Sequence, residues 1–327
     1  MRWLAPAGAL YGQAAALRAR LYRKGLLPQA RLAGPVISVG NLSLGGSGKT
    51  PVVVRIAQIL MEHGVPVAIL SRGYGGSFDG ECLVVADGRT VLADARRAGD
   101  EPSMMARCLP GVVVAVGPKR DVVGRAVEER FGPRVHVLDD GFQHLRLARD
   151  LDVVCVRPDD LLDRPLPAGR LRESPSALSR ANVVLAVDDP GGIVGKRVGT
   201  TDVYRTSHRV EGFFDRDGHR AEAPRRPFLV SGIARPQRFE DDVRARTQGV
   251  AGALRFADHH AFSDRDVATI VRQAQDVQAD AVVTTAKDAG RLPEGSQLAF
   301  LVLRIAAQIE DEGRFRERLL VVARRAP

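Results

Sequence analysis

The chain has no aspartate or glutamate before Glu62, although 39 acidic residues occur among its 327. Eight lysines and arginines lie in residues 1–61, so nearly all of the net charge of +9 belongs to this segment. A basic segment without acids favours an anionic surface as partner, either nucleic acid or membrane. A general bias toward arginine is the alternative, since only five of the 48 cations are lysine, but it does not explain the missing acids.

Cysteine and aromatic residues are also scarce. Three widely spaced cysteines without C-x-x-C spacing exclude a disulfide framework and a cysteine zinc site, and they fit a reducing compartment. One tryptophan and four tyrosines argue against a groove that stacks nucleic-acid bases. We therefore expect no nucleic-acid partner, which leaves a membrane surface.

No uncharged run near the N-terminus is long enough to span a bilayer, because residues 3–17 fall short of the roughly 20 residues required. Leu10, Ala14, Leu17 and Leu21 fall on one helical stripe, which predicts a helix lying in the membrane interface. A cleaved signal peptide fits less well, because the basic cluster follows the apolar run. A first helix that packs on its own domain remains an alternative.

The chain does contain a glycine-rich phosphate loop, in PVISVGNLSLGGSGKTP at residues 35–51. Its β-branched residues predict a buried strand, its glycines a turn lined by N–H groups, and Lys49 the start of a helix. Ser43 stands where the usual G-x-x-x-x-G-K-[ST] pattern has glycine. An ordinary strand-to-helix turn is the alternative. The residues expected to bind nucleotide phosphates are Ser43, Leu44, Gly45, Gly46, Ser47, Gly48, Lys49 and Thr50.

Two further predicted strands end in polar residues that suit phosphate or metal binding. Arg72 and Tyr74 follow a predicted strand at residues 65–70, where open α/β sheets bind ligands. Asp139 and Asp140 end a strand at residues 134–138, where phosphate-loop enzymes keep a Mg²⁺-binding carboxylate. Together with the Thr50 hydroxyl, they predict a magnesium site.

The rhythm of strands and helices predicts an α/β fold of the P-loop NTPase type, a mostly parallel sheet with helices on both faces. A hairpin is expected about Asp87-Gly88, and a helix at residues 238–248. A cleft between two lobes is the expected active site. The predicted segments are a membrane-interface helix at 1–27, a nucleotide-binding domain at 28–202, a β-ribbon linker at 203–227 and a smaller α/β lobe at 228–327.

Six motifs occur in order between residues 40 and 263: GNLSLGGSGKTP, SRGYGG, GDEP, DDGFQH, GRLRE and FADHHAFS. This set resembles the tetraacyldisaccharide 4′-kinases of lipid A biosynthesis, which also lack the first loop glycine. The resemblance implies transfer of the ATP γ-phosphoryl group to the 4′-hydroxyl of an acylated disaccharide 1-phosphate. It also implies a peripheral location at the cytoplasmic face of the inner membrane, without an obligate protein partner.

The resemblance also implies roles for particular residues. Asp100 and His259 would activate the acceptor hydroxyl, and at most one of the vicinal residues His259 and His260 is expected to be catalytic. The other implied roles are phosphate and Mg²⁺ binding by Lys49 and Thr50, metal binding by Asp139 and Asp140 with Glu173 nearby, and substrate contact by Arg72, Tyr74 and Arg120.

A nucleotide-dependent switch or a metal-delivery NTPase is the main rival, since either would also have a phosphate loop and strand-end carboxylates. Guanine-binding proteins of this kind generally carry N-K-x-D, and no such sequence occurs here. In TTAKD at residues 284–288 the lysine and aspartate are adjacent. The sequence therefore favours adenine over guanine.

Overall fold

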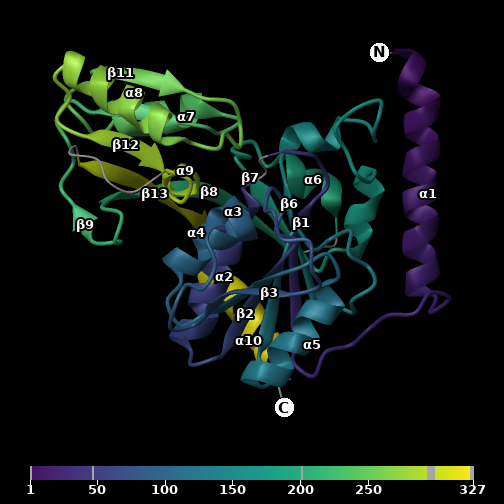
Figure 1. Cartoon of the computed structure of the whole chain (residues 1–327). Helices are drawn as coiled ribbons and strands as arrows, with labels where there is room; N and C mark the ends of the chain where they lie inside the picture. The colour runs from purple at the N-terminus through teal and green to yellow at the C-terminus, as the bar shows by residue number, and fades with distance from the viewer. Residues whose placement is uncertain (1, 46–47, 200–201, 293–298, 325–327) are drawn as a thin grey trace.

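The computed structural model describes residues 2–45, 48–199, 202–292 and 299–324 (Figure 1). Its strands are β1 (Val36–Asn41), β2 (Val67–Ser71), β3 (Leu83–Asp87), β4 (Val113–Val116), β5 (Val135–Asp139), β6 (Leu151–Val156), β7 (Val183–Val187), β8 (Asp202–Phe214), β9 (Arg220–Ala221), β10 (Phe228–Ser231), β11 (Gly252–Arg255), β12 (Val282–Thr285) and β13 (Phe300–Ile309). Its α-helices are α1 (Ala5–Arg23), α2 (Lys49–Glu62), α3 (Ala95–Ala98), α4 (Asp100–Cys108), α5 (Arg120–Phe131), α6 (Ile193–Val198), α7 (Pro236–Arg244), α8 (Asp264–Asp276), α9 (Ala286–Ala289) and α10 (Glu312–Ala323). Its 3₁₀ helices are η1 (Arg2–Leu4), η2 (Pro158–Leu161) and η3 (Pro175–Arg180).

The 13 strands form one mixed sheet in the order β11-β10-β12-β13-β8-β7-β6-β1-β5-β2-β4-β3, with β9 paired to β8 beside this path. Antiparallel pairing joins β13 to β8, β3 to β4 and β8 to β9, and the remaining pairs are parallel. The expected α/β class with a large, mostly parallel sheet is confirmed.

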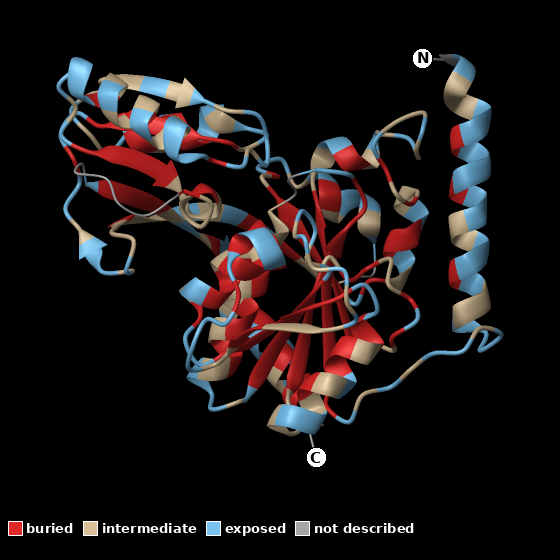
Figure 2. Ribbon diagram, viewed as in Figure 1, coloured by how far each residue is buried: buried red, intermediate tan, exposed pale blue. Residues whose placement is uncertain are grey.

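Helices cover both faces of the central strands, which are buried along their length (Figure 2). Alternation along a strand divides its side chains between the faces. In β4, Val114 and Val116 join the core beneath α2, α4 and α10, whereas Val113 and Ala115 pack on the side of α5. This double coverage explains why residues on both faces of the central strands are buried.

The strand β8 pairs in parallel with β7 and antiparallel with β13, so the sheet continues through the segment expected to be a linker. The expected ribbon about Asp217-Gly218 is formed by β8 and β9. After β13, the last helix packs against α2, where Glu312 accepts hydrogen bonds from Arg55 at 2.6 and 2.9 Å. The division into lobes at 28–202 and 228–327 remains a prediction.

Two local predictions were right in kind but wrong in extent. The hairpin about Asp87-Gly88 is short, with one antiparallel bridge between Ala86 and Val91, because β3 pairs with β4 and the Asp87 carboxylate accepts the backbone N–H groups that follow it. The helix expected at residues 238–248 is α7, which begins earlier at Pro236 and ends at Arg244. Proline suits the first turn of a helix, where its missing N–H costs nothing.

The N-terminal helix α1 lies to one side of the sheet and runs along the segment at residues 165–180 (Figure 1). Its buried residues are small, namely Gly8, Gly12 and Ala19. Within the described part of the chain, no residue of α1 belongs to any of the hydrophobic core clusters. None of the described helices combines the length and the hydropathy needed to cross a membrane.

Candidate active site

The predicted phosphate loop joins β1 to α2, at the carboxyl edge of the sheet. Gly48 adopts a left-handed conformation with φ of 78° and caps α2, so the helix begins at Lys49. Thr50 follows in the first turn and is half-buried. A helix N-terminus that opens from a glycine loop is an anion-binding geometry. Of the expected phosphate-binding residues, Gly46 and Ser47 lie outside the described part of the chain.

The start of the loop is held by the segment that contains GRLRE. Ser43 forms a β-bridge with Leu171, and the Leu44 N–H donates to the Arg170 carbonyl oxygen at 2.8 Å. Gly45 has φ of 101°, which favours glycine. The loop is therefore anchored on one side before it reaches α2.

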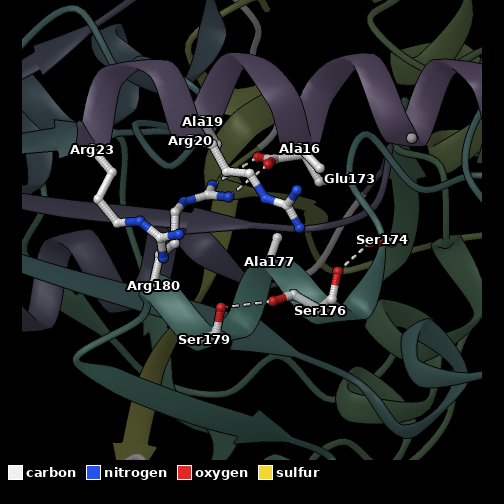
Figure 3. Close-up of a pocket in the computed structure, with 11 residues that line it drawn as sticks. Ala16, Ala19, Arg20, Arg23, Glu173, Ser174, Ser176, Ala177, Ser179 and Arg180 are labelled. Carbon is white, nitrogen blue, oxygen red and sulfur yellow. Dashed lines mark hydrogen bonds and ion pairs between the residues drawn. The ribbon is translucent and has the colours of Figure 1, made fainter. Parts of the chain in front are cut away.

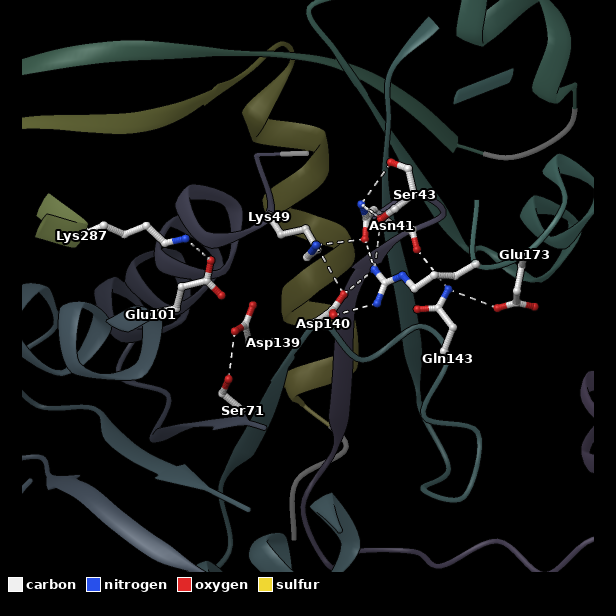
Figure 4. A network of polar contacts seen from close by, with 11 residues as sticks. Asn41, Ser43, Lys49, Ser71, Glu101, Asp139, Asp140, Gln143, Glu173 and Lys287 are labelled. Atoms are coloured by element: carbon white, nitrogen blue, oxygen red, sulfur yellow. Dashed lines mark hydrogen bonds and ion pairs between the residues drawn. The ribbon is translucent and has the colours of Figure 1, made fainter. Parts of the chain in front are cut away.

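Arg172 and Lys49 converge on Asp140 and Asn41. Figure 4 shows Lys49 directed toward both of these residues. Arg172 donates to both carboxylate oxygens of Asp140 at 2.8 Å and also to Asn41 Oδ1. Lys49 Nζ lies 2.9 Å from Asn41 Oδ1 and 3.4 Å from Asp140. Burial raises the pKa of Asp140, but the hydrogen bonds and charges of Arg172 and Lys49 outweigh burial and hold that pKa well below its usual range.

Asp139 has a different environment at the end of β5. Its Oδ2 accepts a hydrogen bond from Ser71 at 3.0 Å, while its buried Oδ1 has no donor among the described residues. Burial, and then the nearby charge of Glu101, raise the pKa of Asp139 to about 7. A buried carboxylate oxygen without a donor, close to the charges of Asp140 and Glu101, suits a hard divalent cation such as Mg²⁺.

Glu101 opens α4 beside this site and pairs with Lys287 of α9, whose Nζ lies 2.7 Å from its carboxylate (Figure 4). Burial raises the pKa of Glu101, but the charge and hydrogen bond of Lys287 lower it on balance. The sequence analysis did not select Glu101, Arg172 or Lys287. The only signal was their place within GDEP, GRLRE and TTAKD.

The structure brings Asp100 and His259 together from positions 159 apart in the chain. His259 Nδ1 lies 2.8 Å from Asp100 Oδ2, and Arg291 Nε lies 3.5 Å from the same oxygen. Gly99 occupies the N-cap of α4 with φ of 89°, so Asp100 is not the cap. The ring of Tyr74 meets that of His259 edge to face, with centroids 5.9 Å apart.

His260 has a different role, although it is adjacent to His259. Its Nε2 lies 3.2 Å from Asp266, within the capping box that begins α8 at Ser263, and its ring stacks on Phe256 at 4.6 Å. The left-handed backbone of His259, with φ of 60°, helps to turn the two vicinal imidazoles apart. Of the two histidines, His259 is the one that contacts Asp100.

The residues expected to contact substrate lie at the ends of neighbouring strands. Tyr74 is 75% exposed, and Arg72 is exposed as well. Arg120 is buried, donates to the carbonyl oxygens of Gly117 and Pro118, and has a pKa lowered by burial and then by the charge of Arg72. Its buried Nε has no acceptor among the described residues.

Glu173 is connected to the phosphate loop indirectly. It accepts hydrogen bonds from Arg180 at 2.8 and 3.0 Å and from Gln143 Nε2 at 3.2 Å. The Gln143 side chain also donates to the Asn41 carbonyl oxygen at 3.0 Å. Within the described residues, Glu173 forms no hydrogen bond with Asp139 or Asp140.

A glycine loop at a helix N-terminus, a lysine at that helix start and carboxylates at the neighbouring strand end define a phosphate-loop protein. The carboxylate–imidazole pair beside them adds a group that can accept a proton. A phosphate-binding site combined with a proton acceptor is typical of a phosphotransferase active site.

Comparisons with known proteins agree with this class. The family model described as Tetraacyldisaccharide-1-P 4′-kinase matches residues 1–324. A tetraacyldisaccharide 4′-kinase of Geobacter sulfurreducens is 41% identical over 297 residues, covering 88% of this chain and 83% of the relative. One from Anaeromyxobacter dehalogenans is 42% identical over 302 residues, covering 88% and 80%.

A solved structure is similar over almost the whole chain. It is described as the "apo" form of LpxK from Aquifex aeolicus in complex with ATP, with a TM-score of 0.84, 29% identity and 98% of each chain covered. The chain therefore belongs to the tetraacyldisaccharide-1-P 4′-kinase family of lipid A biosynthesis. The resemblance carried by the six motifs is confirmed, and the switch or metal-delivery reading is not supported.

Proposed function

We propose that this chain transfers the γ-phosphoryl group of ATP to the 4′-hydroxyl of tetraacyldisaccharide 1-phosphate. The contact between Asp100 and His259 beside the phosphate loop carries the proposal, because it joins a proton acceptor to a phosphate-binding site. The names of the relatives, and the ATP bound by the similar solved structure, support the choice of substrates.

The ATP phosphates would meet the N-terminus of α2 and the Lys49 ammonium. Lys49 already lies within hydrogen-bond distance of Asn41, so it is positioned at the loop before nucleotide binds. Arg172 holds the Asp140 carboxylate through both of its oxygens. Such preorganised charges stabilise phosphoryl transfer because they need little rearrangement during the reaction.

The Thr50 hydroxyl, Asp139 and Asp140 would hold Mg²⁺, with Glu101 as a further carboxylate. Bound Mg²⁺ neutralises charge on the β- and γ-phosphates. Glu173 would act from farther away, since it reaches β1 through Gln143. Arg72, Tyr74 and Arg120 would contact the phosphate or sugar of the acceptor, and the buried Nε of Arg120 provides a donor for that purpose.

The acceptor hydroxyl would lose its proton to the Asp100–His259 pair as its oxygen forms a bond to the γ-phosphorus. The bond from that phosphorus to the bridging oxygen breaks, and ADP leaves with the electron pair. The proton rests on the imidazole, whose positive charge Asp100 balances across the 2.8 Å contact. The Arg291 guanidinium lies within ion-pair distance of the same carboxylate oxygen, at 3.5 Å.

The proposal also places α1 at the cytoplasmic face of the inner membrane. Trp3, Leu10 and Leu17, spaced seven residues apart, are 79%, 69% and 57% exposed and form an apolar stripe away from the buried glycines. An exposed apolar stripe with basic residues beyond it fits an interfacial helix. Peripheral attachment would bring the active site to an acylated substrate.

The direct test is transfer of label from γ-labelled ATP to an acylated disaccharide phosphate, with Mg²⁺ and detergent present. Lys49→Ala should lower kcat/KM by at least ~10²-fold, roughly 3 kcal/mol of transition-state stabilisation. Lys196→Ala, on the exposed surface of α6, is the matched control and should behave as wild type. Absence of labelled lipid with wild type would refute the proposed reaction, and near-normal transfer by Lys49→Ala would remove the loop assignment.

A further inference from the structure

A small polar cavity lies between α1 and η3, outside the proposed catalytic residues (Figure 3). Its volume is about 170 Å³, and its lining includes Arg20 and Arg23 from α1, Arg180, Ser176 and Ser179 from η3, and Glu173. Figure 3 shows Arg20 and Arg23 extending from α1 toward η3. Three arginines and one glutamate give this cavity an excess of two positive charges.

The small residues of α1 permit this arrangement. A Cβ atom at Gly8 would lie 2.8 Å from both Ala168 Cβ and the Pro165 carbonyl oxygen, and one at Gly12 would lie 3.1 Å from Pro165 Cγ. The helix can therefore approach this segment closely only with glycine at these positions. Farther along α1, the close packing of the helix on this segment places Arg20 and Arg23 next to η3.

The charges in the cavity are not balanced from within. Glu173 is bonded to both terminal nitrogens of Arg180. Within the described chain, no carboxylate lies within ion-pair distance of Arg20 or Arg23. Arg20 and Arg23 are exposed residues that both line this cavity, so an anion bound there would gain from both charges. Ser174, Ser176 and Ser179 line the same space, but the Ser179 hydroxyl already donates to the Ser176 carbonyl oxygen at 2.9 Å, and the Ser174 and Ser176 hydroxyls bond to each other at 2.6 Å, so the arginines are the main donors to a bound anion.

The cavity is small compared with the roughly 300–1,000 Å³ pockets that enclose drug-sized ligands. It fits a compact anionic group with its hydration better than a sugar or an acyl chain. A phosphate monoester is such a group, since its three terminal oxygens match the paired donors of arginine. The exposed apolar stripe of α1 lies on the same helix, so a membrane lipid is the natural source.

We propose that this cavity binds the phosphate monoester headgroup of a membrane lipid. The inference rests on the proposed position of α1 at a membrane surface. The bound headgroup would lie beside Arg180, whose partner Glu173 connects through Gln143 to the end of β1. Arg18 of α1 also donates to the Gln143 carbonyl oxygen, at 3.3 Å. Headgroup binding would thus fix α1 against the segment that supports the phosphate loop.

The test measures binding of the full chain to phosphatidylcholine vesicles that contain either phosphatidic acid, a monoester, or phosphatidylglycerol, a diester, matched in zeta potential. Wild type should bind the monoester vesicles about tenfold more tightly, equivalent to ~1.4 kcal/mol. The double variant Arg20→Ala/Arg23→Ala should lose this preference. Lys24→Ala/Arg31→Ala removes the same charge from exposed residues outside the cavity and should keep the preference.

The possible failures are distinguishable. Equal binding of wild type to both vesicles, or an unchanged preference in the Arg20/Arg23 variant, would overturn the cavity assignment while leaving α1 at the membrane. No binding to either vesicle would overturn both this inference and the proposed membrane location. If soluble glycerol phosphate at equal phosphate concentration displaced the protein from monoester vesicles, the cavity would be a site for free phosphate esters instead of a lipid site.

Discussion

The vicinal residues His259 and His260 have similar exposure but different partners. The imidazole of His259 is bonded to Asp100 and lies edge-on to Tyr74, whereas that of His260 supports the start of α8. A carboxylate bonded to one imidazole nitrogen fixes the tautomer and raises the basicity of the other nitrogen. The structure therefore supports treating Asp100 and His259 as one functional unit.

Residues that act as a unit should show losses that do not add. We expect Asp100→Ala, His259→Ala and the double variant to lose similar factors in kcat, on the order of 10² to 10³, with ATP affinity nearly unchanged. Transfer assays and ATP titrations measure these quantities, and His260→Ala is the matched control. If the loss of kcat in the double variant equals the product of the two single losses, the residues act independently. A His259→Ala variant with wild-type kcat would refute the role of the Asp100–His259 pair.

Asp139 should make the metal-free protein less stable as the pH rises. Its folded-state pKa of about 7 exceeds the roughly 3.9 of an unfolded aspartate, so the folded state binds more protons between these values. Stability is therefore lost as the pH rises through this window. Relative to wild type, Asp139→Asn should gain stability, on the order of 4 kcal/mol at pH 8 without Mg²⁺ and little at pH 4.

Urea unfolding of both proteins at the two pH values measures this difference. Mg²⁺ should stabilise wild type but have less effect on Asp139→Asn, because a ligand that binds only the folded state shifts its stability. Asp163→Asn is a control in which the stability change at pH 8 should have the opposite sign, a loss instead of a gain. Burial raises the Asp163 pKa, but hydrogen bonds from Arg164 and Arg170 lower it on balance. Equal wild-type and Asp139→Asn stabilities at pH 8 would contradict the assigned environment.

A single site residue could be predicted from the sequence only where its residue type is unusual for its position in a strand, loop or helix. A lysine after a glycine loop and two acids at a strand end are such cases, so Lys49, Asp139 and Asp140 were found from the residues alone. Arg172, one of 48 cations, carries no such signal until its bonds to Asp140 are seen. Arg180 lies outside every motif, and only packing brings it to Glu173.

Among the elements, α1 differs most from its sequence-based description. Its apolar stripe was predicted, but the contact of its opposite face was not, because glycine and alanine carry little hydrophobic signal. Those small residues allow the close approach to Pro165 and Ala168. The helix thus has two distinct faces, an apolar one toward solvent and one of small residues toward the protein.

Gly8→Leu should release α1 from the segment at residues 165–180. A leucine normally favours a helix by about 1 kcal/mol over glycine, but here its side chain meets backbone and Ala168 below van der Waals distance. Tryptic cleavage within α1 should therefore become several-fold faster, since local opening exposes the chain to protease. Ala14→Leu, at an exposed position, should leave the rate unchanged. Equal rates in the two variants would contradict the close contact.

At the scale of the molecule, the continuity of the sheet was the least predictable feature. The segment that contains β8 was expected to be a β-ribbon linker because its residues alternate about Asp217-Gly218. Pairing with β13 requires contacts across about a hundred residues, which local patterns do not encode. The alternation of strands with helices, by contrast, predicted the α/β class correctly.

The charge distribution of the whole chain and the absence of α1 from the described core clusters lead to one further prediction. Residues 1–24 carry five of the eight cations that precede Glu62. Each is worth about 1 kcal/mol near an anionic membrane surface, in a salt-dependent manner. Deleting residues 1–24 should therefore release the protein from anionic vesicles, as cosedimentation would measure at low and high salt.

The truncated protein should nevertheless fold and bind ATP, because α1 contributes nothing to the described core clusters and lies apart from the phosphate loop. Urea unfolding and ATP titration provide that control. In the full-length protein, Trp3 is the only tryptophan and is 79% exposed, so its emission should shift to the blue when α1 enters the membrane interface. A truncated chain that unfolds would make α1 part of the domain, and an unshifted Trp3 emission on bound vesicles would place the attachment elsewhere.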